Sequence, residues 1–107
     1  MIVRYHPDFP GDIRRFAADY ETISPGLATR FRAEIQEAIE VIKGGPSAAG
    51  HFLKTESLIV PEFRRRNLRA FPFFVLYGVT SDTLIFGSVI PTKSDPLNWL
   101  VRFGIEG

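Results

Sequence analysis

The chain of 107 residues contains no cysteine. This absence excludes disulfide bonds, thiolate nucleophiles and cysteine-based zinc sites, and it fits a reducing cytosol. No uninterrupted apolar run approaches the roughly 20 residues that a membrane-spanning helix needs. Residues 1–6 carry no basic segment ahead of a long apolar run, so we expect no signal peptide. Together these absences predict a cytoplasmic protein that does not enter a membrane.

An excess of one charge sign is also missing, because 13 Lys and Arg residues oppose 12 Asp and Glu residues. Nucleic-acid binding would therefore need a local patch, since phosphate affinity comes from several cations gathered together. Ten phenylalanines are many for this length and predict a core built from aromatic rings. The length suits a single domain over residues 1–107, which can bury a core without metal or disulfide support.

The first half of the chain predicts a strand followed by two helices. Residues 2–6 are β-branched and aromatic, and a proline follows them, which is typical of a short strand. Residues 8–20 and 24–42 each begin with a capping residue and a nearby proline, then place apolar residues at helical spacing. Residues 43–46 should end the second helix, with a glycine as a left-handed cap. The short link between the helices predicts an antiparallel hairpin that covers a sheet.

The second half of the chain predicts mainly strands. Residues 47–61 give no clear pattern, and within them 51–53 suit either half a helical turn or an irregular extended piece. Residues 63–69 are extended and basic. Residues 73–79 are apolar at nearly every position, as in a central strand covered on both faces. Residues 84–90 return as its hairpin partner, with Gly87 marking a bulge.

A short helical turn beginning at Asp95 and Pro96 should end the chain. The expected fold is therefore α+β: a strand, a helical hairpin, a three-stranded antiparallel sheet and a C-terminal helical turn.

Four stretches carry a resemblance to a known family when they are read in chain order. They are YETISPGLATRF at 20–31, RRRNLR at 64–69, FPFFVLY at 71–77 and DPLNWLVR at 95–102. In this order and with these gaps the chain resembles the RelE/ParE toxin superfamily, and it is nearer to the ParE branch. One departure lies at 91–96, which reads PTKSDP, whereas ParE-like chains often carry a histidine and two arginines before the Asp-Pro step.

This resemblance implies the toxin of a type II toxin–antitoxin system of the plasmid-stabilisation type, held inactive in a hetero-oligomer by a cognate antitoxin. ParE-like members inhibit DNA gyrase and arrest growth, whereas RelE-like members cut messenger RNA on the ribosome. Our first hypothesis is a gyrase inhibitor that acts by binding and uses no cofactor. A ribosome-dependent endoribonuclease and a non-toxic antitoxin-binding relative are the alternatives, because a fold does not fix a function.

Six residues are the candidates for contact with the target or the antitoxin, since Arg and Trp dominate interface hot spots. They are Arg64, Arg66, Arg69, Lys93, Trp99 and Arg102. Strand alternation predicts that Arg64 and Arg66 share one face and that Arg65 and Arg69 share the other. The alternatives are a solvated edge strand for the arginines and a packing role for Trp99.

No residue is assigned a catalytic role. Metal-free RNA cleavage needs a general base, a cation and a proton donor. His6 and His51 lie outside the basic strand, and Tyr77 is expected in the core as a ring on the central strand. No histidine pair has metal-ligand spacing. Three glutamates at helical spacing are expected on a solvated helix face, namely Glu34, Glu37 and Glu40.

Overall fold

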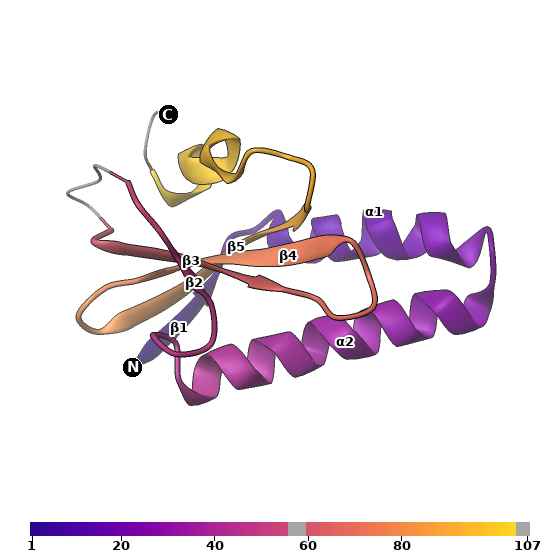
Figure 1. Cartoon of the computed structure of the whole chain (residues 1–107), viewed down its shortest axis with the longest axis horizontal. Coiled ribbons are helices and arrows are strands. Elements are labelled where there is room, and N and C mark those ends of the chain that lie inside the picture. Colours follow the sequence, from indigo (N-terminus) through magenta and orange to yellow (C-terminus); the bar gives the residue numbers. More distant parts are fainter. Residues whose placement is uncertain (56–59, 105–107) are drawn as a thin grey trace.

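The computed structural model describes residues 1–55 and 60–104 (Figure 1). Its elements follow one another as β1 (Ile2–Tyr5), α1 (Phe9–Glu21), α2 (Pro25–Gly44), β2 (His51–Leu53), β3 (Glu62–Asn67), β4 (Phe73–Val79), β5 (Thr83–Pro91) and the 3-10 helix η1 (Pro96–Phe103). Helices α1 and α2 cover one face of the sheet, and η1 lies over the other face (Figure 1). The expected α+β fold with a helical hairpin is confirmed. Within these ranges no helix is long and apolar enough to cross a membrane.

The sheet differs from the expected three-stranded antiparallel arrangement. It has five strands in the order β1-β5-β4-β3-β2, and β1 runs parallel to β5. Only β3, β4 and β5 match the expectation. The reason is that β1 pairs with a strand some 80 residues later, with Ile2 opposite Thr83, and such a pairing leaves no local signal in the sequence. Residues 51–53 are extended because they pair with β3, with Phe52 opposite Arg64.

The core lies on both faces of β4, which is buried at every position from Phe73 to Val79, as its unbroken apolar run predicts. On the helix side, the ring of Phe31 packs edge-on against Phe71 at 5.4 Å between centroids. On the other side, the ring of Phe103 from η1 packs edge-on against Phe63 at 4.8 Å. Nine of the ten phenylalanines thus belong to two ring-rich clusters, one under the helices and one under η1, whereas Phe52 is exposed.

Gly87 marks a bulge, as expected. Leu76 faces Ser88 while Tyr77 faces Phe86, so Gly87 is the extra residue on β5. A β-carbon at Gly87 would overlap the ring of Phe103. The glycine therefore allows η1 to approach the sheet closely.

The N-terminal end of α2 agrees with the prediction from the sequence, whereas its C-terminal end does not. The hydroxyl of Ser24 accepts a hydrogen bond from the backbone N–H of Gly26 at 3.2 Å, which confirms the predicted cap. The left-handed glycine cap predicted for the other end is wrong, because Gly45 has φ −170° and is extended. Pro46 explains the difference, since proline disfavours helical geometry in the residue before it.

Candidate protein-binding surface

Arg64 and Arg66 lie on the same face of β3, as strand alternation predicts, and both guanidinium groups bind the loop that follows α2. Arg64 donates to the carbonyl oxygen of Gly50 at 2.9 Å, and Arg66 donates to that of Ala49 at 2.8 Å. Arg64 also forms an ion pair with Glu62. Both arginines are only partly exposed. These two cations therefore hold the loop against the sheet.

Arg65 and Arg69 do not share a face, contrary to the alternation argument. Arg65 lies over the ring of Phe74, 3.8 Å from its centroid, on the side that η1 covers. Arg69 reaches α2 instead and pairs with Glu37 at 2.8 Å. The prediction fails because β3 ends at Asn67, so the period-two rule no longer applies at Arg69.

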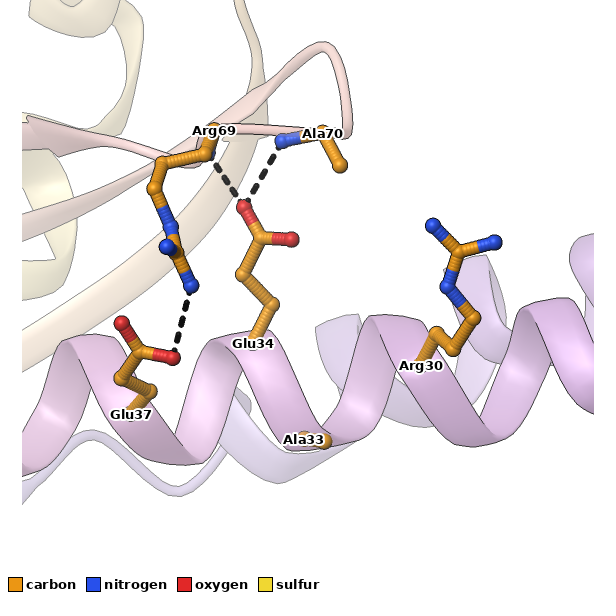
Figure 2. A pocket seen from close by; sticks show the side chains of 6 residues that line it. All are labelled: Arg30, Ala33, Glu34, Glu37, Arg69 and Ala70. Carbon is orange, nitrogen blue, oxygen red and sulfur yellow. Dashed lines mark hydrogen bonds and ion pairs between the residues drawn. The ribbon is translucent and has the colours of Figure 1, made fainter.

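An open pocket of about 430 Å³ lies between α2 and the turn after β3 (Figure 2). Glu34 closes one side of it by accepting hydrogen bonds from the backbone N–H groups of Arg69 and Ala70, the latter at 2.9 Å. Arg30 reaches up from α2 beside Glu34, and its guanidinium has no ion-pair partner among residues 1–55 and 60–104 (Figure 2). Glu34 and Glu37 are therefore not simply solvated, because they fasten the turn to the helix.

The C-terminal candidates lie around η1. Trp99 is partly buried and packs against the ring cluster on that side of the sheet. Leu97 and Val101 are 46% and 63% exposed on the same helix. Lys93 is exposed in the link between β5 and η1, and the described part of the chain offers it no ion-pair partner. Trp99 thus anchors η1 to the sheet and stays partly exposed, and the same helix exposes two apolar side chains.

Arg102 is bound within the chain by a residue that the sequence did not single out. Its two terminal nitrogens meet the two oxygens of Asp12 on α1, at 2.6 and 3.1 Å. Asp12 is only 4% exposed and also accepts from the backbone N–H of Val89 at 3.0 Å. Arg102 donates further to the carbonyl oxygen of Gly87 at 3.1 Å. This network joins α1, the β5 bulge and η1.

The six candidate contact residues therefore do not form one patch. Arg64 and Arg66 hold the loop after α2, and Arg69 borders the pocket on α2. Trp99 and Arg102 lie on the opposite face of the sheet. Lys93 lies in the link that leads to them.

The side chains suited to acid–base chemistry are not brought together. Tyr77 is fully buried and donates to the carbonyl oxygen of Pro46 at 2.7 Å. Burial raises the pKa of Tyr77 to about 12, although nearby Arg64 acts in the opposite direction. His6 follows β1 and His51 lies on β2, at opposite edges of the sheet. Within the described ranges no three His, Asp or Glu side chains gather as a metal site.

The arrangement is that of a ParE-like α+β fold. A chain of the solved chromosomal ParDE TA system from P. aeruginosa is similar to this one, with a TM-score of 0.68 and 16% identity over 85% of this chain and 95% of that chain. At this identity the likeness shows the fold, and the resemblance seen in the sequence is confirmed at that level. No family model matches the chain, and no curated protein matches it.

Proposed function

We propose that this chain is the toxin of a ParE-like type II toxin–antitoxin system and that it inhibits DNA gyrase by binding. The observation that carries the proposal is the fold shared with nearly the full length of a chain from a ParDE TA system. The four sequence stretches that resemble this superfamily add to it. The proposed protein is cytoplasmic, arrests growth when free, serves in plasmid stabilisation, and forms a hetero-oligomer with a cognate antitoxin.

The placement of Tyr77 supports binding over RNA cleavage. A general base or acid must reach the reacting atoms, and its pKa should lie near the working pH. Tyr77 has neither property, because its ring is fully buried and its pKa is raised to about 12. The two histidines sit at opposite edges of the sheet. The RelE-like alternative would need a different set of residues.

The proposed contact surface for gyrase centres on η1 and the link before it. Lys93 supplies an exposed cation, and η1 carries the partly exposed Trp99 and the exposed Leu97 and Val101. Aromatic anchors with apolar neighbours are typical of the centre of a protein interface. In this proposal Arg102 contributes by holding η1 in place.

The antitoxin is proposed to lie across the helical hairpin on the other side of the molecule. Arg30 offers a guanidinium that has no ion-pair partner among the described residues at the open pocket, and the side chain of Arg69 is 73% exposed there. Cations in this position suit an acidic segment of the antitoxin, because arginine binds carboxylates in a bidentate manner. Arg64 and Arg66 would support this side indirectly by fixing the loop after α2.

The proposal is tested by a supercoiling and cleavage assay with the purified chain and gyrase from its own host. We expect loss of supercoiling and accumulation of protein-linked linear plasmid. Trp99→Ala and Lys93→Glu should weaken inhibition while keeping the circular dichroism of the parent chain. Glu40→Gln, an exposed change on α2, is the matched control and should inhibit like the parent.

Unchanged supercoiling at excess protein would contradict gyrase inhibition. Translating ribosomes are then the next sample, and cuts in the messenger would support the RelE-like alternative. Expression without growth arrest, together with retained binding to an antitoxin, would indicate the non-toxic relative.

A further inference from the structure

The C-terminal half of β5 lies at a sheet edge, because β1 is too short to cover it. The parallel ladder between the two strands ends at Phe86, and the chain that formed β1 turns away into α1. Beyond this point two side chains bind backbone groups of β5. Asp12 accepts from the N–H of Val89 at 3.0 Å, and Arg102 donates to the carbonyl oxygen of Gly87 at 3.1 Å. The pair of side chains therefore takes the place that a neighbouring strand would occupy.

The same pair links two elements that lie on opposite faces of the sheet. Asp12 lies in the first turn of α1, where the N-terminus of a helix favours a negative side chain. Arg102 lies in the last turn of η1. Its two terminal nitrogens bind the two oxygens of Asp12 at 2.6 and 3.1 Å, and such a bidentate contact fixes the direction of a guanidinium as well as its distance. Helix α1 thereby constrains the orientation of η1.

The period of η1 relates the position of Arg102 to the residues that η1 exposes. A 3-10 helix has three residues per turn, so side chains three positions apart share a face. Leu100 and Phe103 share the buried face of η1. Trp99 and Arg102 share the next face, and both are partly buried. Val101 lies on the third face and is 63% exposed. A contact that fixes Arg102 therefore also fixes how η1 presents Trp99 and Val101.

The apolar contacts of η1 hold it against the sheet but specify its rotation less strictly. The ring of Phe103 lies where β-carbons at Gly78 and Gly87 would crowd it, and apolar burial of this kind is non-directional. Eight residues are also many for a 3-10 helix, because runs beyond three or four residues are uncommon, so its geometry depends on tertiary contacts. The ion pair between Asp12 and Arg102 supplies a directional contact.

We propose that Asp12 is a positioning residue for target binding, because through Arg102 it sets the rotation of η1 that presents Trp99 and Val101. This inference rests on the proposed function, in which η1 is the contact surface for gyrase. Asp12 itself is 4% exposed and lies on α1, so it acts on the target only through Arg102. A surface that is held in its binding geometry beforehand binds more tightly, because less ordering is left for the binding step.

Two conservative variants test the positioning role without removing either side chain. Asp12→Asn keeps an oxygen for the N–H of Val89 but loses the second carboxylate oxygen, and Arg102→Lys keeps the charge but loses the planar fork. In the supercoiling assay with gyrase from its own host, each variant should need about tenfold more protein than the parent for half-inhibition. Asp19→Asn makes the same chemical change at an exposed position of α1 and should inhibit like the parent.

Two measurements on the chain alone separate the position of η1 from the stability of the whole fold. Amide hydrogen exchange followed by mass spectrometry should become faster across η1 in Asp12→Asn, while α2 exchanges as in the parent. Acrylamide should quench the fluorescence of the single tryptophan, Trp99, more strongly in this variant. Ile35→Val, a buried change under the helical hairpin, lowers the stability of the fold but should leave both measurements and the inhibition unchanged.

An Asp12→Asn variant that inhibits gyrase as strongly as the parent would overturn the positioning role and leave gyrase inhibition intact. An equal loss of inhibition in Ile35→Val would overturn it as well, because general stability would then explain both losses. A parent chain that does not inhibit gyrase would contradict the proposed function instead. Amide exchange then decides alone: faster exchange confined to η1 in Asp12→Asn supports the positioning of η1 by Asp12, and unchanged exchange refutes it.

Discussion

Replacing Asp12 by alanine should be among the most destabilising single changes in this chain. Asp12 is 4% exposed and binds both terminal nitrogens of Arg102 and the backbone N–H of Val89. Removing one partner of a buried ion pair costs about 3–5 kcal/mol, because the other charge stays buried without compensation. The side chain of Arg102 is 18% exposed and gains some relief from water, so we expect about 3 kcal/mol for Asp12→Ala.

The contribution of the pair is measured by a double-mutant cycle. Arg102→Ala leaves Asp12 with Val89 as its remaining donor and should also cost about 3 kcal/mol. The loss of unfolding free energy in the double variant should be smaller, by at least about 1.5 kcal/mol, than the sum of the losses in the two single variants. The reason is that either single change already breaks the pair. Asp12→Asn keeps an acceptor for Val89 and should fall between the parent and Asp12→Ala.

Urea unfolding followed by fluorescence is a suitable assay, because Trp99 is the single tryptophan and lies on η1 near this network. Circular dichroism on the same samples reports the whole fold. In the Asp12 variants, a fluorescence change at lower urea than the dichroism change would show that η1 leaves the sheet first. Glu40→Ala removes an exposed pair with Lys43 and should cost at most about 0.5 kcal/mol. A loss below about 1 kcal/mol for Asp12→Ala, or additive single changes, would refute the reasoning.

Three further predictions concern the sheet and its supports. Burial raises the pKa of Tyr77 to about 12. The neutral tyrosine therefore stabilises the fold fully below pH 10, and this stabilisation is lost as the pH rises towards 12. In an absorbance titration at 295 nm, Tyr77→Phe should lack the ionisation step that the parent chain shows at the highest pH. Gly87→Ala places a methyl group against the ring of Phe103 and should cost about 1–3 kcal/mol in urea unfolding, with partial recovery when Phe103→Leu is added. Glu34→Ala leaves the backbone N–H groups of Arg69 and Ala70 without their acceptor and should cost about 1–2 kcal/mol, several times more than Glu40→Ala. Equal losses for the two variants would contradict a role of Glu34 in fastening the turn after β3 to α2.

Local signals predicted the helices and the central strands well. Ser24 and Pro25 mark the start of α2, and the unbroken apolar run at 73–79 coincides with β4. The two edge strands were not assigned to the sheet, because each is defined by its neighbour. β1 depends on a parallel pairing with a distant strand, and β2 depends on three residues of β3. Length and propensity alone do not specify such pairings.

The candidate surface was less predictable than the fold. Arg102 was singled out as a contact residue, but the sequence does not reveal a partner on α1, 90 positions away. One signal was available: Asp12 falls on the same helical stripe as Phe9 and Phe16, so a charged residue occupies a position expected to be buried. A carboxylate at such a position predicts a cation elsewhere in the chain as its partner, because buried carboxylates are nearly always paired.

The use of the arginines also bears on which kind of target the chain suits. Arg64 and Arg66 donate to carbonyl oxygens of the loop, while Arg69 and Arg102 pair with carboxylates of the helices. Guanidinium groups that are already bound contribute little to phosphate contacts, and strong nucleic-acid binding needs several free cations together. The basic stretch at 64–69 is therefore used largely within the fold. We therefore expect the stretch from Arg64 to Arg69 to contribute little to the binding of nucleic acid.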